Sequence, residues 1–260
     1  MTWKRKAPAS VFSRRLFNLL RSAVSATPAW RQAPTLIAIF VAAAATWLLV
    51  EIAQEVGAGT TSNLDRAVVM MFRTAGDTRR LVGPAWVQEM MRDFTALGGI
   101  GVLTIVTGTV TGYLLLERKR GAAVLLLVAT SGGVIVSQVM KLGFARARPD
   151  IEPVSTIVLT SSFPSGHSTM AAAVYLTCAV LMASYSERRR VKSYVIVIAA
   201  FIAIVVGASR VYLGVHWPTD VLAGLCLGSA WALFCWVGLR LLQVLGWVEP
   251  EVTSGTSSAQ

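Results

Sequence analysis

The feature that most constrains this chain is a series of six apolar stretches, each about as long as a membrane is thick. A helix needs about 20 mostly apolar residues to cross the hydrocarbon core of a bilayer. The stretches cover approximately residues 35–53, 98–116, 121–140, 166–184, 194–210 and 220–243. They predict an all-α fold, a polytopic membrane bundle of six transmembrane helices.

The composition agrees with a membrane protein. Of the 260 residues, 55% are hydrophobic and 14% are charged, and the mean hydropathy is +0.62. Soluble domains average about 25% charged residues. The net charge of +11 would suggest a nucleic-acid partner in a soluble protein. Here most basic residues lie between the apolar stretches, so membrane topology explains them and no nucleic-acid partner is expected.

Lys and Arg residues predict which side of the membrane each loop occupies. Seven lie within residues 1–33, and two basic runs follow the second and fourth apolar stretches, at 117–120 and 187–192. The positive-inside rule places these segments in the cytoplasm. Both termini are then cytoplasmic. The loops after the first, third and fifth stretches face the periplasmic or extracellular side of the cytoplasmic (inner) membrane.

The remaining segments complete the predicted domain organisation. Residues 1–33 form a basic cytoplasmic segment with an interfacial helix, and residues 34–243 form the transmembrane domain. Its outer loop, residues 54–97, has apolar residues at helical spacing, which predicts short interfacial helices. Residues 244–260 form a short cytoplasmic tail.

Two pairs of glycines, Gly108/Gly112 and Gly224/Gly228, lie inside predicted helices. This four-residue spacing lets helix backbones approach closely. The contact is either a specific dimer interface or packing within the bundle, and packing is favoured.

Cations and both histidines gather at helix ends predicted to face outside. A single Lys or Arg at a membrane boundary commonly extends to the interface. Four cations beside the chain's two histidines instead predict an anionic partner and catalysis. The cations are Lys141, Arg146, Arg148 and Arg210, and the histidines are His167 and His216.

The first two polar segments have the chemistry of a phosphate site. Lys141 and Arg148 are seven residues apart, about two helical turns, so they can share a face and bind several phosphate oxygens. Ser165 is expected to cap the fourth transmembrane helix. The N–H groups at that helix start can bind an anion, which Gly166 lets approach the backbone. His167 then lies within a turn of the phosphate.

The third segment offers a histidine with a carboxylate four residues later. Arg210 ends the fifth helix, and Pro218 and Asp220 begin the sixth. Asp220 either caps that helix or hydrogen-bonds one nitrogen of His216, which would leave the other nitrogen free to attack phosphorus.

Together these segments resemble the type-2 phosphatidic acid phosphatase family, which also includes the vanadium-dependent haloperoxidases. The family signature is Lys-x6-Arg-Pro, Pro-Ser-Gly-His and Ser-Arg-x5-His-x3-Asp. The chain matches all eleven specified positions, at Lys141, Arg148, Pro149, Pro164, Ser165, Gly166, His167, Ser209, Arg210, His216 and Asp220. The motifs cover residues 141–220, and the helix layout extends the resemblance over about 35–243, which implies a haloperoxidase-like core.

The resemblance implies a role for each matched residue. His216 looks like the nucleophile that forms a phosphohistidine, Asp220 its orienting carboxylate and His167 the general acid. The phosphate would be held by Lys141, Arg148, Ser165, Gly166, Arg210 and Ser209, although Ser209 could serve packing alone. Neither a metal nor a cofactor is expected. Arg146 lies outside the signature and is expected to bind a second phosphate or a lipid headgroup.

The implied function is a metal-independent membrane lipid phosphatase whose partners are its lipid phosphate substrate and the surrounding lipids. The expected substrate is a polyprenyl diphosphate such as undecaprenyl diphosphate, or phosphatidic acid, phosphatidylglycerol phosphate or lipid A phosphate. A lipid phosphotransferase with the same site is an alternative that the motifs do not separate. A non-enzymatic transporter or scaffold is disfavoured, because the signature is intact and no inverted repeat is visible.

Overall fold

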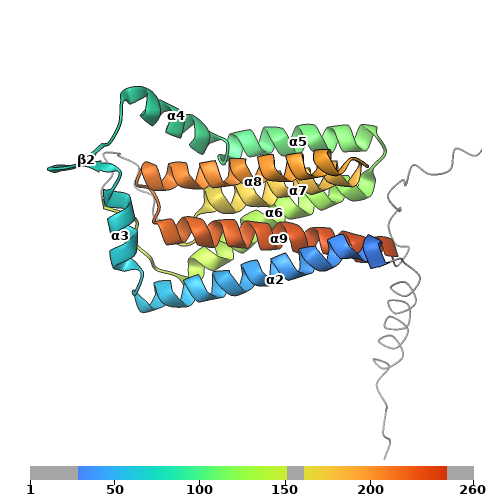
Figure 1. Cartoon of the computed structure of the whole chain (residues 1–260), viewed down its shortest axis with the longest axis horizontal. Helices are drawn as coiled ribbons and strands as arrows, with labels where there is room; N and C mark the ends of the chain where they lie inside the picture. Colours follow the sequence, from blue (N-terminus) through green and yellow to red (C-terminus); the bar gives the residue numbers. More distant parts are fainter. Residues whose placement is uncertain (1–28, 151–160, 245–260) are drawn as a thin grey trace, which may run out of the picture.

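Long helices run side by side along one axis of the protein (Figure 1). The computed structural model describes residues 29–150 and 161–244. The long helices are α2 (Ala29–Ala58), α5 (Ile100–Leu116), α6 (Arg120–Gly143), α7 (Gly166–Ser184), α8 (Arg189–Tyr212) and α9 (Pro218–Val244). The predicted all-α membrane fold is confirmed.

Within the described residues, five helices are long and apolar enough to cross a membrane: α2, α6, α7, α8 and α9. Helix α5 has 17 residues. It follows α4 (Ala85–Ala96) after a short break, and the two helices meet at a bend of 47°. Counted together as one bent span, they bring the total to the six that the sequence predicts. The protein is a multi-pass membrane protein.

Helix α7 lies at the centre of the bundle and packs against α5, α6, α8 and α9. Its middle is made of small buried residues, including Ala171, Ala172 and Ala173. Gly224 and Gly228 of α9 face it, since a Cβ atom on Gly224 would lie 2.6 Å from the carbonyl oxygen of Ser165. Packing within the bundle is therefore the correct interpretation of this glycine pair.

The other glycine pair does not pack within the bundle. A Cβ atom on Gly108 or Gly112 would meet no atom of the described structure within 4 Å. The packing interpretation is therefore wrong for this pair. Four-residue glycine spacing predicts a helix face without side chains, but it does not predict whether that face points into the bundle or away from it.

The connection between α2 and α5 lies at one end of the bundle, and the α5–α6 turn lies at the opposite end (Figure 1). The connection contains helix α3 (Ser62–Met70), a short antiparallel hairpin of β1 (Arg73–Thr74) and β2 (Asp77–Leu81), and α4. The hairpin was not expected from the sequence. Residues 1–28 and 245–260, with most of the predicted N-terminal segment and the tail, lie outside the described residues.

Candidate active site

The predicted site residues come together at the end of the bundle where α3 and the hairpin lie. They are carried by the last turn of α6, the segment after it, the start of α7, the last turn of α8, the connection between α8 and α9, and the start of α9. Residues far apart in the sequence therefore form one cluster. Its members are Lys141, Arg148, Ser165, Gly166, His167, Ser209, Arg210, His216 and Asp220.

A buried phenylalanine anchors the segment that leads into α7. Phe163 is fully buried, packs against Leu49 and Leu227, and lies with its ring 4.6 Å from that of Phe144. Just after this anchor, the backbone N–H of Ser165 donates a hydrogen bond to the carbonyl oxygen of Asp220 at 2.9 Å. The start of α7 is thus joined directly to the start of α9.

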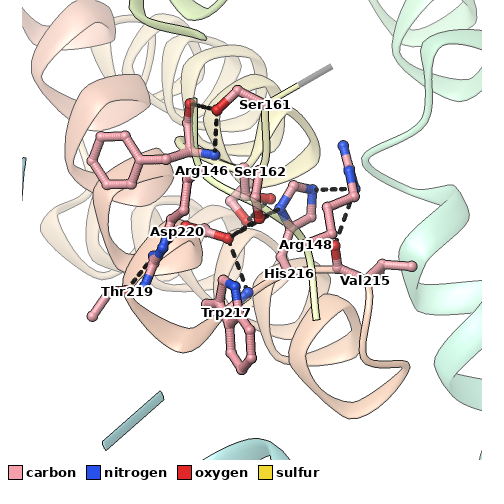
Figure 2. Close-up of polar contacts among 12 residues, drawn as sticks. Arg146, Arg148, Ser161, Ser162, Val215, His216, Trp217, Thr219 and Asp220 are labelled. Atoms are coloured by element: carbon pink, nitrogen blue, oxygen red, sulfur yellow. Dashed lines mark hydrogen bonds and ion pairs between the residues drawn. The ribbon is translucent and has the colours of Figure 1, made fainter. Parts of the chain in front are cut away.

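Asp220 both caps α9 and lies beside His216. Its Oδ2 accepts a hydrogen bond from the backbone N–H of Trp217 at 2.9 Å and lies 3.5 Å from Nδ1 of His216 (Figure 2). A carboxylate in the first helical turn that reaches back to the residue preceding the helix is one half of a capping box. The capping interpretation of Asp220 is confirmed, and the position of the same carboxylate beside Nδ1 of His216 is compatible with the second interpretation, which stays a prediction.

Two further side chains hold the Asp220 carboxylate. Ser162 donates a hydrogen bond to Oδ2, and its Oγ lies 3.4 Å from Nδ1 of His216. Arg146 donates from Nη1 to Oδ1 at 2.5 Å. Asp220 is fully buried, so these contacts stabilise its charge and fix its orientation.

The opposite nitrogen of His216 faces a cation. Its Nε2 lies 3.4 Å from Nη1 of Arg148, which also donates to the carbonyl oxygen of Val215 at 3.0 Å (Figure 2). The pKa of His216 is lowered from 6.5 to about 4. Burial is the largest cause, the charges of Arg210 and Arg148 also lower this pKa, and Asp220 opposes them by raising it. His216 is therefore neutral at pH 7, as a nitrogen nucleophile must be.

The remaining polar groups surround the same region. Lys141 donates from Nζ to the carbonyl oxygen of Ser161 at 2.9 Å, and a Cβ atom on Gly166 would lie 3.9 Å from Cε of Lys141. His167 interacts electrostatically with Arg210, Arg148 and His216. Three cations and two imidazoles thus share one small region, which suits an anion that carries more than one charge.

Helix α7 presents its N-terminal amides to this region. Its first backbone hydrogen bond runs from the N–H of Thr169 to the carbonyl oxygen of Ser165. The N–H groups of Gly166, His167 and Ser168 therefore precede the intrahelical bonds and can bind an anion. Ser165 occupies the N-cap position without a side-chain capping bond, contrary to expectation; its Oγ accepts from Ser168 at 3.0 Å instead.

Ser209 has its hydroxyl engaged by protein groups. Its Oγ donates to the carbonyl oxygen of Val206 at 2.7 Å and lies 2.7 Å from Oγ1 of Thr95 in α4. The side chain is fully buried. Of the two roles left open for Ser209, this geometry favours packing between α4 and α8.

Arg146 does not have the role that the sequence suggested. Its guanidinium lies between two buried carboxylates, Asp220 and Asp65 of α3, each at 2.5 Å. Both terminal nitrogens of Arg146 are engaged by these carboxylates. The prediction that Arg146 binds a second phosphate or a lipid headgroup is therefore wrong, and its contacts are internal to the protein. Sequence reasoning missed Asp65 and the role of Ser162, because neither side chain belongs to a motif of its own.

Fold and site together define a class: a multi-pass membrane protein with clustered cations, free helix N-terminal N–H groups and a buried histidine at one end of a helical bundle. Residues 122–242 match the PAP2 superfamily. Phosphatidylglycerophosphatase B of Bacillus subtilis is 36% identical over 149 residues, 57% of this chain and 73% of the relative. Lipid A 1-phosphatase of Rhizobium etli is 32% identical, over 58% of this chain and 70% of the relative.

A solved structure agrees with the sequence relatives. The crystal structure of the PAP2-type phosphatidylglycerolphosphate phosphatase from Bacillus subtilis superposes with a TM-score of 0.67 at 29% identity, covering 75% of this chain and 94% of that one. The chain belongs to the PAP2 superfamily and is an integral membrane lipid phosphatase.

Proposed function

We propose that this protein hydrolyses the phosphomonoester or diphosphate headgroup of a membrane lipid through a phosphohistidine formed on His216. The observation that carries the proposal is the position of the His216 ring. Its Nδ1 lies 3.5 Å from the Asp220 carboxylate, while its Nε2 lies 3.4 Å from the guanidinium of Arg148. One nitrogen is oriented by an acid, and the other faces the place where a phosphate would be bound.

The proposed reaction has two steps. In the first, Nε2 of His216 attacks phosphorus, the bond from phosphorus to the leaving oxygen breaks, and His167 donates a proton to that oxygen. In the second, His167 takes a proton from water, the water oxygen attacks phosphorus, and the phosphorus–nitrogen bond breaks to release phosphate. Lys141, Arg148, Arg210 and the N–H groups at the start of α7 stabilise the charge on the phosphoryl oxygens.

The surroundings of the cluster favour a lipid substrate. Leu142, next to Lys141, is 88% exposed. Ile100 is 87% exposed and lies at the start of α5, just after the break between α4 and α5 that contacts His167. Exposed apolar side chains of this kind are stable in a bilayer, so a headgroup can reach the site while its chains remain in the membrane.

The substrate we propose is phosphatidylglycerol phosphate, phosphatidic acid or a polyprenyl diphosphate such as undecaprenyl diphosphate. Relatives named phosphatidylglycerophosphatase B and undecaprenyl-diphosphatase match this chain at 36% and 34% identity. We further propose that the site faces the periplasmic or extracellular side and that both termini are cytoplasmic. The basic turns at 117–120 and 187–192 lie at the ends of helices opposite those that carry the site.

Release of phosphate by purified protein tests the proposal. The panel is phosphatidylglycerol phosphate, phosphatidic acid, undecaprenyl diphosphate and lipid A 1-phosphate, each in detergent with a metal chelator. Wild type should release phosphate from at least one lipid, and His216→Ala should lower the rate at least about 10³-fold. Asp93→Asn, an exposed position of α4, is the matched control.

Three outcomes would contradict the proposal. No phosphate release from any lipid would remove the phosphatase assignment, and transfer of the phosphoryl group only to a second lipid would favour the phosphotransferase. Full activity of His216→Ala would remove the phosphohistidine. The intermediate itself is measured by alkaline quench with 32P-labelled substrate, where a protein-bound label that survives base and is lost in acid should appear in wild type and be absent from His216→Ala.

A further inference from the structure

The connection between α2 and α5 contains a buried aspartate, Asp65, that contacts Arg146, the guanidinium partner of Asp220. Asp65 of α3 is 1% exposed. Its Oδ2 accepts hydrogen bonds from Nη2 of Arg146 at 2.5 Å and from Oγ1 of Thr219 at 2.7 Å, and its Oδ1 accepts from the backbone N–H of Thr219 at 3.0 Å. Burying a carboxylate this completely is costly unless it is paired.

Arg146 connects this aspartate to the site. Nη1 of Arg146 donates to Oδ1 of Asp220 at 2.5 Å, and Nη2 donates to Oδ2 of Asp65 at the same distance (Figure 2 shows the Asp220 side). A chain of contacts therefore runs from Asp65 through Arg146 and Asp220 to His216. One guanidinium, 14% exposed, is shared by two carboxylates.

The charge count explains what the second carboxylate contributes. A single Arg146–Asp220 pair would be neutral, and Arg146 would offset the negative charge that Asp220 presents to the imidazole. With Asp65 included, the two carboxylates and the guanidinium carry one net negative charge. That charge is available when His216 becomes positive as its Nε2 bonds to phosphorus, and in a poorly solvated site such an interaction is strong.

We propose that Asp65 is a positioning residue for the phosphatase reaction: it balances the charge of Arg146, so that Asp220 keeps its negative charge directed at His216. This inference rests on the proposed roles of His216 and Asp220. It makes the connection between α2 and α5 part of the machinery that orients the nucleophile.

A purely structural role for Asp65 is the competing hypothesis. Asp65 accepts the N–H of Thr219 in the first turn of α9, so its loss could simply loosen that helix start. The two hypotheses differ in which state of the reaction they affect. Loosening weakens every bound state alike, whereas a lost charge affects mainly the state in which His216 is bonded and positive.

The variant Asp65→Asn separates the two. It keeps an acceptor for the Thr219 N–H and removes the negative charge, together with the acceptor that Oδ2 offers to Arg146 and to the Thr219 hydroxyl. We expect kcat to fall roughly tenfold to a hundredfold with little change in KM, the range seen when groups that orient an active-site ligand are removed. Asp93→Asn makes the same substitution at an exposed position of the neighbouring helix α4 and should retain wild-type kcat.

Two inhibitors provide a readout that loosening alone does not produce. Orthovanadate mimics the five-coordinate transition state, so its inhibition reports on the state in which His216 bonds to the anion. Phosphate mimics the product, so its inhibition reports on an anion that is bound without a covalent bond to His216. Asp65→Asn should weaken inhibition by orthovanadate at least tenfold and inhibition by phosphate less than threefold. Equal losses for both anions, or a kcat within twofold of wild type, would overturn the proposal.

A double variant tests the charge argument and covers poor folding of the single one. Asp65→Asn with Arg146→Gln removes both charges, and its kcat should exceed that of each single variant that folds. A double variant less active than Arg146→Gln alone would overturn the proposal. Failure of the proposed function gives a different result, because wild type would then release no phosphate, or His216→Ala would remain active, whatever Asp65→Asn does.

Discussion

At the scale of single residues, the environment of His216 decides the chemistry of the site. The ring is 2% exposed and lies between an acid on one nitrogen and a guanidinium on the other. Burial favours the neutral form, and in the proposed reaction the adjacent Asp220 would stabilise the positive charge that develops when the ring bonds to phosphorus. A neutral imidazole at neutral pH follows from this arrangement, which is the state that the proposed nucleophile requires.

The titration of His216 can be measured directly. Its pKa is lowered from 6.5 to about 4, mainly by burial, so the side chain should stay neutral from pH 8 down to pH 5 and gain its proton only near pH 4. In His167→Gln, His216 is the only histidine of the chain. Histidine 15N NMR of this variant in detergent should show no titration between pH 8 and 5.

The same pKa has a consequence for stability. The unfolded chain takes up the histidine proton near pH 6.5 and the folded protein only near pH 4. The folded state therefore loses stability as the pH falls through this window, because the unfolded state binds more protons. A midpoint near 6.5 in the folded variant would contradict the buried, neutral histidine.

At the scale of elements, close packing of α7 against α9 holds the two helix starts together. A Cβ atom on Gly228 would clash with the carbonyl oxygen of Thr169 and lie 2.8 Å from Cβ of Ala172. Because both partners belong to a packed helix, the clash has to be relieved by separating α7 and α9. The distance between Ser165 and Asp220, on which the site depends, is set by this contact.

Substitution of these glycines should give opposite results on two helices. Gly228→Ala should lower the free energy of unfolding by about 1–3 kcal/mol, the usual range for overpacking. Gly108→Ala, on the outward face of α5, should leave stability unchanged or raise it, since alanine favours helix over glycine. Thermal unfolding in detergent measures both, and equal melting temperatures would show that α9 does not approach α7 this closely.

At the scale of the whole molecule, the polar candidate site and the basic turns at 117–120 and 187–192 lie at opposite ends of the bundle. The connection between α2 and α5, with α3, the hairpin and α4, lies beside the site, and the α5–α6 turn lies at the other end (Figure 1). This polarity is the reason to expect that the site opens to the outer face, where a basic cluster is otherwise disfavoured.

Cysteine labelling tests that orientation. In a background with Cys178, Cys226 and Cys235 replaced by serine, Asp77→Cys on the hairpin should react with a membrane-impermeant maleimide in intact cells. Glu117→Cys, exposed in the turn after α5, should react only after permeabilisation. Labelling of Glu117→Cys alone in intact cells would place the site in the cytoplasm.

Much of this protein was determined by its sequence alone. The apolar stretches predicted the long helices, because a bilayer demands about 20 apolar residues with internally satisfied backbones. The three polar segments predicted which residues gather at one end, since clustered cations and histidines at a membrane boundary repel one another unless they bind an anion. Both signals are local, so they can be read without knowing how the helices pack.

Only the tertiary structure decided what the remaining polar groups do. Asp65 lies in an ordinary helical stretch, and Arg146 differs little from its neighbour Arg148 in sequence. Their roles depend on which side chains meet after folding: Arg146 turns inward to two carboxylates, while Arg148 reaches His216. The outward direction of Gly108 was decided in the same way. Contacts between distant segments are set by packing of the whole bundle, which no single stretch of sequence encodes.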